Sequence, residues 1–217
     1  MRAGSQVRED VRGKVVWGRR VRVFAAVVLA GLSASCGDMQ REGQASSFLI
    51  VNALQAARGD DPTKFAGNLL SDVLTVVKDT PTIFNDVGQV QLHLAMKDPG
   101  STNSPTTPTS ANFITVTQYH VEFVRADGQN RQGIDVPYAF DGAFTATVGS
   151  DDATASFTLV RNIAKAEAPL AALASSGVII STIAKVTFYG HDQTGREVSA
   201  TASISVDFGN FADKEAS

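Results

Sequence analysis

The chain has 217 residues, of which 43% are hydrophobic and 19% charged, so it can bury a core, which argues against wholesale disorder. Its formal net charge of −3 argues against a nucleic-acid-binding protein. A single cysteine excludes an internal disulfide and a zinc site built from several cysteines.

The first 35 residues differ from the remainder in charge. They hold seven of the 19 Lys and Arg residues but only two of the 22 acidic residues. An uncharged apolar run at 23–32 follows Arg22, and it is shorter than the roughly 20 residues that a membrane-spanning helix needs. A basic segment, a short apolar run and then small residues predict a secretory signal peptide over residues 1–35.

The only cysteine, Cys36, closes the stretch Leu32-Ser33-Ala34-Ser35-Cys36. This stretch resembles the lipobox of bacterial lipoproteins, although Ser33 stands where that family prefers Leu. The resemblance implies cleavage before Cys36 and attachment of a diacylglycerol to its thiol, and two acyl chains anchor a protein stably. It predicts a membrane-anchored lipoprotein of the bacterial cell envelope, on the periplasmic or cell-surface face. Cleavage one or two residues away by the ordinary signal peptidase is the alternative.

Residues 36–62 are expected to form the lipidated N-terminus, a tether and a short helix. Residues 37–45 are polar and include two glycines, as in flexible tethers. Over residues 46–59, a serine suits a helix N-cap and Gly59 suits a helix end, which favours a short helix. The apolar run Phe48–Val51 fits the opening of a strand equally well.

The pattern then changes to a period of two, which is typical of half-buried strands. Alternation predicts one strand at 89–96, with its apolar face formed by Val90, Leu92, Leu94 and Met96. A second strand is predicted at 115–123, with one face formed by Thr115, Thr117, Tyr119, Val121 and Phe123. It ends before the turn dipeptide Asp127-Gly128.

Two hairpins are expected further along the chain. One joins strands at 144–148 and 155–160 through the turn at 149–152, and the other joins strands at 184–189 and 198–208. Between them, Pro169 near the start and Gly177 past the end favour a short helix over 168–174.

Roughly seven strands with turn signals between them predict a mainly β fold, an antiparallel β-sandwich with one or two short helices. We assign it to residues 63–211, followed by a polar tail at 212–217. The pattern resembles immunoglobulin-like and fibronectin-type-III-like domains of bacterial surface proteins. The cysteine pair of antibody domains is absent and the only tryptophan, Trp17, lies in the signal region, so the fibronectin-like variety is favoured.

No residues are predicted to hold a metal or another cofactor. His93 and His120 lie on strands predicted to be neighbours, but neither they nor His191 belong to a close-spaced metal motif, and solvent-facing histidines are expected. Calcium prefers loop oxygens, and Asp60-Asp61, Asp151-Asp152 and Asp192 with Thr194 offer some. None has EF-hand spacing, and ordinary turn residues account for them.

Catalysis is not expected. The chain has no G-x-S-x-G elbow, and lipidation of Cys36 would remove its only thiol. The alternative function is an envelope enzyme or an accessory carbohydrate-binding module. Sugar-binding platforms usually need exposed aromatic rings, and the chain beyond the signal region has no tryptophan and three tyrosines.

The segment at 98–112 is too long for a tight hairpin and holds three prolines among many hydroxyl side chains. Long ordered loops often carry binding, although a solvated insertion would look the same. We predict a partner-binding loop formed by Pro99, Gly100, Asn103, Pro105 and Pro108.

The sequence thus predicts a lipid-anchored, non-catalytic envelope protein with a structural, adhesive or protein-interaction role. Its partners are the membrane, through the lipid, and an unidentified envelope protein or surface polymer.

Overall fold

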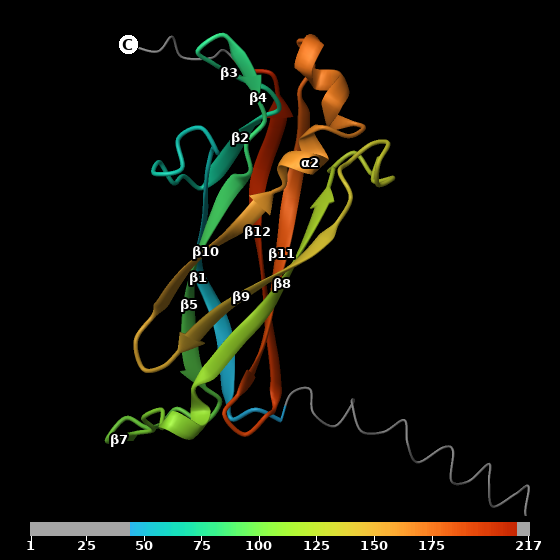
Figure 1. Ribbon diagram of the computed structural model, residues 1–217. Helices are drawn as coiled ribbons and strands as arrows, with labels where there is room; N and C mark the ends of the chain where they lie inside the picture. Colours follow the sequence, from blue (N-terminus) through green and yellow to red (C-terminus); the bar gives the residue numbers. More distant parts are fainter. Residues whose placement is uncertain (1–43, 212–217) are drawn as a thin grey trace, which may run out of the picture. The chain divides into compact units, whose positions relative to one another are not determined.

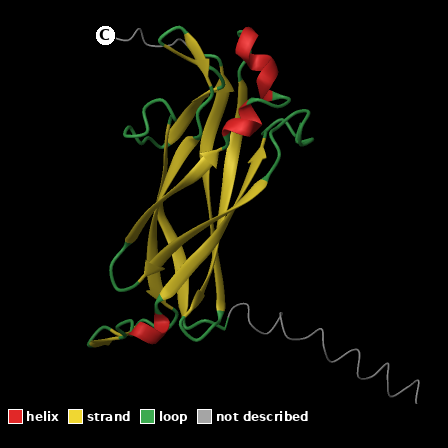
Figure 2. Cartoon of the chain, in the orientation of Figure 1, coloured by secondary structure: helices red, strands yellow, loops and turns green. Residues whose placement is uncertain are grey.

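The structure is a computed structural model, and it describes residues 44–211. The predicted signal peptide, Cys36 and the polar tail at 212–217 lie outside the described residues. The described part is an elongated arrangement of strands with a few short helical turns at its two ends (Figures 1 and 2). The expectation of a mainly β protein with short helices is therefore confirmed.

The smaller of the two main sheets has three antiparallel strands. Their spatial order is β1 (Ser47–Ala57), β5 (Asp86–Met96) and β10 (Ala153–Val160). The predicted strand at 89–96 is the main part of β5, and its alternation is confirmed because Val90, Leu92 and Leu94 are buried.

The larger sheet has five strands, in the order β2 (Asn68–Asp72), β12 (Glu197–Gly209), β11 (Ile180–Asp192), β8 (Ile114–Val124) and β9 (Phe140–Val148). All its pairs are antiparallel except β2 with β12, which run parallel. The predicted hairpin around 191–196 is confirmed, because β11 and β12 pair from Ile180 opposite Phe208 to His191 opposite Glu197.

Short elements occupy the two ends of the domain. Two small hairpins are formed by β3 (Thr75–Val77) with β4 (Thr80–Thr82), and by β6 (Gly100–Ser101) with β7 (Ser104–Pro105). The helical turns are η1 (Ser110–Asn112), α2 (Asn162–Lys165) and η2 (Leu170–Ser175). The helix expected over 168–174 is thus the 3-10 helix η2, which buries Leu170 and Leu173.

The inward side chains of both sheets form one hydrophobic core. Rings join the two sheets at its centre, since Phe157 of β10 lies 5.5 Å from Phe188 of β11 and 4.9 Å from Tyr119 of β8, measured between ring centroids. Two glycines leave space for these rings. A Cβ atom at Gly88 would collide with the ring of Phe157, and one at Gly142 with the ring of Tyr119.

The short helix expected over residues 46–59 is wrong, because Ser47–Ala57 form strand β1. This segment pairs with β5 along most of its length, with a register shift between Val51 and Ala53. The shift interrupts the period of two, so the strand shows no continuous alternation in the sequence. Pairing with β5 overrides the local signals for a helix.

The hairpin expected around 149–152 is also wrong, although both strands exist. β9 belongs to the five-stranded sheet and β10 to the three-stranded sheet, so the turn carries the chain from one sheet to the other. Turn residues indicate a reversal, but they do not show whether the two strands pair with each other.

The face predicted for the strand at 115–123 is only half correct. Tyr119, Val121 and Phe123 are buried as expected, but Ile114 and Val116 are buried in place of Thr115 and Thr117. A register shift between Val116 and Gln118 explains the difference, because one extra residue moves every following side chain to the other face.

Candidate functional site

The predicted partner-binding loop is a folded, exposed projection that links β5 to β8. Its side chains are exposed from Lys97 to Thr107, so Pro99, Gly100, Asn103 and Pro105 are all accessible, and Pro108 is half-buried. Gly100 has a φ of +74°, and its N–H donates to Asp98 Oδ1 at 3.0 Å. The N–H of Thr106 donates to the carbonyl of Pro99 at 3.0 Å.

The base of this loop is fixed to the first residues of β1 through Asn112. The Asn112 Nδ2 donates to Ser46 Oγ at 2.7 Å, and the Ser47 hydroxyl donates to the Asn112 carbonyl at 3.1 Å. We call this part of the domain the loop end, formed by residues 98–112, the start of β1 and the turn at 193–196 (bottom of Figure 1). The chain therefore enters the domain beside the predicted binding loop.

The turn between β11 and β12 is built around the buried carboxylate of Asp192. Its Oδ1 accepts hydrogen bonds from Thr194 Oγ1 at 2.6 Å, from the Thr194 N–H at 2.8 Å and from the Arg196 N–H at 3.0 Å. Burial alone would raise the pKa of Asp192, but these hydrogen bonds outweigh burial and lower it. Its Oδ2 is buried and has no hydrogen-bond partner among the described residues.

The three histidines each contact a different residue, and His191 lies 3.1 Å from the carbonyl oxygen of Asp192. His93 of β5 and His120 of β8 are on different sheets, so the expectation that their strands are neighbours is wrong. Each has its own carboxylate partner at 2.8 Å, Asp152 for His93 and Asp141 for His120. The hydrogen bond from His93 and another from Asn52 lower the pKa of Asp152.

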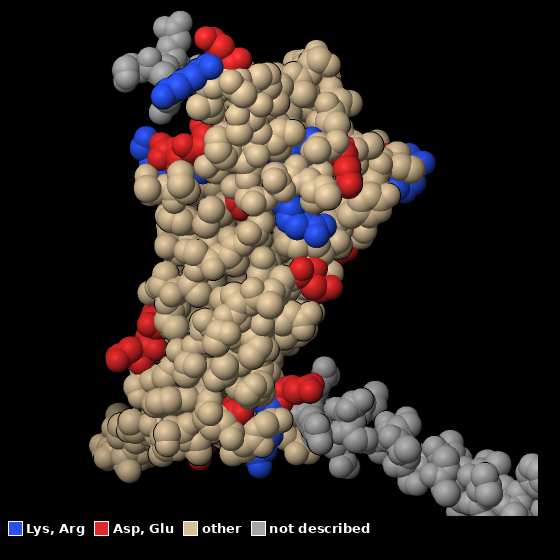
Figure 3. Space-filling view, viewed as in Figure 1, with Lys and Arg blue, Asp and Glu red and all other residues tan. Residues whose placement is uncertain are grey.

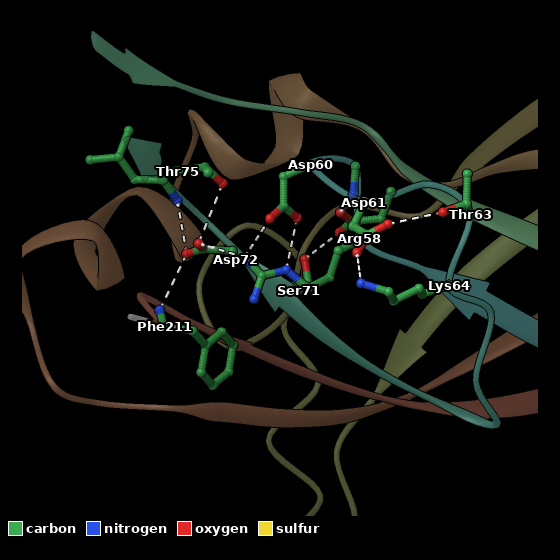
Figure 4. Close-up of polar contacts among 12 residues, drawn as sticks. Arg58, Asp60, Asp61, Thr63, Lys64, Ser71, Asp72, Thr75 and Phe211 are labelled. Carbon is green, nitrogen blue, oxygen red and sulfur yellow. Dashed lines mark hydrogen bonds and ion pairs between the residues drawn. The ribbon is translucent and has the colours of Figure 1, made fainter. Parts of the chain in front are cut away.

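The acidic pair Asp60-Asp61, considered above for calcium, binds cationic side chains instead. Asp60 contacts Arg58 at 2.8 Å, and Asp61 contacts Lys64 Nζ at 2.6 Å (Figure 4). In the part of the chain that the structure describes, no group of three or more His, Cys, Asp or Glu side chains could hold a metal ion.

A cluster of buried charged groups lies at the opposite end of the domain from the loop. Asp72, at the end of β2, contacts Arg58 at 3.2 Å and accepts hydrogen bonds from Thr75 Oγ1 at 3.3 Å and the Phe211 N–H at 3.2 Å (Figure 4). Burial alone would lower the pKa of Arg58, but the hydrogen bond and charge of Asp60, with the charges of Asp72 and Asp86, raise it. We call this the far end, formed by residues 58–64, residues 70–86 with the β3–β4 hairpin, α2, η2, residues 176–179 and residues 209–211.

The most deeply buried ion pair of the far end joins Asp86 and Lys165. Lys165 Nζ lies 2.8 Å from Asp86 Oδ2, and each side chain is 1% exposed. The Ser71 hydroxyl donates to the same Oδ2 at 2.6 Å, and the Gly59 N–H donates to Oδ1 at 2.9 Å. The Asp86 carboxylate of β5 is therefore contacted by three other segments of the chain, which contain Gly59, Ser71 and Lys165.

Sequence reasoning did not find this pair. Asp86 precedes the alternating part of β5 and reads as a turn residue, while Lys165 reads as an exposed charge. The two residues are 79 positions apart (165 − 86), and only the tertiary fold brings them together. One signal was present, since Lys165 lies in an otherwise mostly apolar stretch.

The far end also exposes large apolar side chains. They are Leu70, Val76, Val77, Ile163, Val178 and Ile179. Figure 3 shows an uncharged surface at the very top of the domain, next to the charged turn beside the C-terminal tail, with acidic and basic side chains below it. The loop end exposes mainly hydroxyl groups and prolines, with the ring of Phe48 at the start of β1 as an exposed apolar side chain.

No helix within residues 44–211 is long and apolar enough to cross a membrane. Comparisons with protein-family models, with curated proteins and with solved structures found no match for this chain. What the protein does is therefore inferred from the sequence and from the geometry of its two ends.

Proposed function

We propose that the protein is a lipid-anchored, non-catalytic domain of the bacterial cell envelope that contacts another envelope protein or a surface polymer. The anchor is a diacylglycerol on Cys36. The observation that supports it best is the position of the only cysteine, directly after the apolar run and small residues of the signal peptide.

The length of chain between Cys36 and the start of the domain limits how far the domain can lie from the membrane. Ser46 lies ten positions after Cys36, and an extended chain of that length spans at most about 35 Å. Since Ser46 lies at the loop end, the anchor would keep that end within this distance of the membrane.

The anchor is tested by Cys36→Ala, with Ser35→Ala as a matched control in the same stretch. We expect the Cys36 variant to lose incorporation of labelled fatty acid and to leave the membrane fraction, while the control retains both. Unchanged membrane retention of the Cys36 variant would overturn the anchor.

For the fold, we propose the fibronectin-type-III-like variety of the immunoglobulin-like β-sandwich. The strand order supports it: of the seven long strands, the first, second and fifth (β1, β5 and β10) form one sheet, and the other four lie in the second sheet. The parallel pairing of the short β2 with the last strand, β12, fits an initial strand that changes sheets.

The loop at 98–112 is the proposed contact surface, because it is exposed, internally hydrogen-bonded and fixed to the domain through Asn112. The exposed apolar side chains of the far end favour a second candidate surface, which would meet a partner farther from the membrane.

Site-specific photo-crosslinking in intact cells distinguishes the two surfaces. A crosslinking amino acid is placed at Asn103 of the loop, at Val77 of the far end, or at Thr201 on the outer face of the larger sheet as a control. A protein or polymer adduct from Asn103 alone supports the loop. An adduct from Val77 alone moves the contact to the far end. Adducts from none of the three positions would overturn the interaction role.

A further inference from the structure

The pair formed by Lys165 and Asp86 has the arrangement of two groups poised to react with each other. The amine nitrogen lies 2.8 Å from a carboxylate oxygen, so it is also within close range of the carboxylate carbon. Both side chains are 1% exposed, so bulk water has little access to either. Sealing two opposite charges inside a protein is costly, even when they contact each other.

We propose that Lys165 Nζ and Asp86 Cγ condense into an amide, giving the domain an intramolecular cross-link between β5 and α2. The product is neutral, so it removes the cost of keeping a cation and an anion away from water. It would also hold together two segments that are separated by 79 positions in the chain (165 − 86).

The reaction needs only the groups already present. One proton passes from Nζ to Oδ2 along their contact, which leaves an amine and a carboxylic acid. The nitrogen lone pair then attacks Cγ, and the negative charge develops on Oδ1. The Gly59 N–H, 2.9 Å from Oδ1, donates to that oxygen and stabilises the charge.

The leaving group is water. A second proton moves from the nitrogen to Oδ2 along their 2.8 Å contact, while the Ser71 hydroxyl, which donates to Oδ2 at 2.6 Å, stabilises the departing oxygen. The bond between Cγ and Oδ2 then breaks, and Oδ1 again becomes a carbonyl oxygen. One C–O bond breaks and one C–N bond forms, and no oxidant, reductant or added cofactor takes part.

The backbone around Gly59 is arranged so that its N–H can play this part. A Cβ atom at Gly59 would collide with the carbonyl of Asn85 and with the side chain of Phe84. A larger residue would therefore push the N–H away from Asp86. In this proposal Ser71 and Gly59 position and stabilise the reacting groups.

The test is peptide mapping of the full chain, extracted from its membrane fraction, denatured and digested with trypsin. We expect a branched peptide that joins residues 79–97, which contain Asp86, to residues 162–185, which stay uncut because trypsin does not cleave after an acylated lysine; its mass is the sum of these two segments less one water molecule. Two separate, unmodified fragments, with no branched peptide, would overturn the proposal. The result does not depend on the lipid, so it is independent of the anchor at Cys36.

Two variants locate the bond. Lys165→Arg keeps a cation at the site but has no amine to acylate, so we expect the branched peptide to disappear. Asp86→Asn can still react, with ammonia leaving instead of water, so its branched peptide should have the same mass as that of the unaltered protein. If a branched peptide that includes the Asp86 fragment persisted in the digest of the Lys165→Arg chain, the link would not be at Lys165, and the assignment would be overturned.

Discussion

Buried carboxylates have different kinds of partners at the two ends of the domain. At the far end, Asp72 and Asp86 each contact a cationic side chain from a distant part of the chain. At the loop end, the buried Asp192 accepts hydrogen bonds from Thr194 and Arg196, which are two and four residues away. The far end is therefore held by long-range charge pairs, and the loop end by local hydrogen bonds.

This difference indicates where stability resides. A charge pair between distant segments fixes the fold itself, and removing one partner leaves a buried charge without compensation. A local turn around a carboxylate fixes only its own few residues. The following predictions, from the largest effect to the smallest, test this contrast.

The largest effect is expected for Lys165→Met. The Asp86 carboxylate would remain buried with neither a cation nor a cross-link to compensate it, which costs at least about 3–5 kcal/mol of unfolding free energy. Urea unfolding measures the loss, and Lys185→Met, at an exposed position of β11, is the control with a change within about 0.5 kcal/mol. Equal losses in the two variants would show that the far end does not depend on this pair.

A smaller effect is expected for Arg58→Met. Asp72 would lose its cation but keep its hydrogen bonds from Thr75 and from the Phe211 N–H, so we expect a loss of about 1–3 kcal/mol. The control is Arg125→Met, because the pair of Arg125 with Asp127 is more exposed and local in the sequence. If the control were as damaging as Arg58→Met, burial would not be the deciding factor.

At the loop end, Asp192 should contribute to the pH dependence of stability. Its pKa is lowered in the folded state, so the unfolded chain binds more protons below about pH 4 and stability falls as pH falls. Asp192→Asn should lower stability at neutral pH and flatten this acid dependence. Urea midpoints measured between about pH 7 and pH 3 test the prediction, with the exposed Asp151→Asn as control. An unchanged acid slope in Asp192→Asn would contradict it.

The smallest effect is expected when residues 100–110 are deleted. This segment adds no buried residue to the core and leaves Asn112 in place, so the change should be within about 0.5 kcal/mol. Chemical denaturation should remain cooperative. Loss of a cooperative transition would show that the loop stabilises the domain and is more than a contact surface.

Much of the strand content could be predicted because it depends on local alternation. The strands predicted at 89–96, 184–189 and 198–208 alternate without interruption, and β5, β11 and β12 confirm them. The period is interrupted by register shifts in β1 and β8, and there the sequence led to a helix over 46–59 and to the wrong faces for Thr115 and Thr117.

Pairing between distant segments could not be predicted in the same way. The turn at 149–152 looks the same whether its strands pair or enter different sheets. The contact of Asp86 with Lys165 likewise depends on how β2, β5 and α2 pack, and no local pattern encodes that packing. The loop at 98–112 was located from composition alone, because prolines and hydroxyl side chains act locally.

The direction of β1 has a mechanical consequence. Its first residues lie at the loop end, and it runs antiparallel to β5 from Ser47 opposite Met96 to Ala57 opposite Val87. A pull between the membrane and a partner held at the other end would act along this strand. The hydrogen bonds of the ladder lie across the direction of such a force, so they would be loaded together in shear and not opened one at a time. The β1–β5 ladder is thus oriented to resist a pull along the strand.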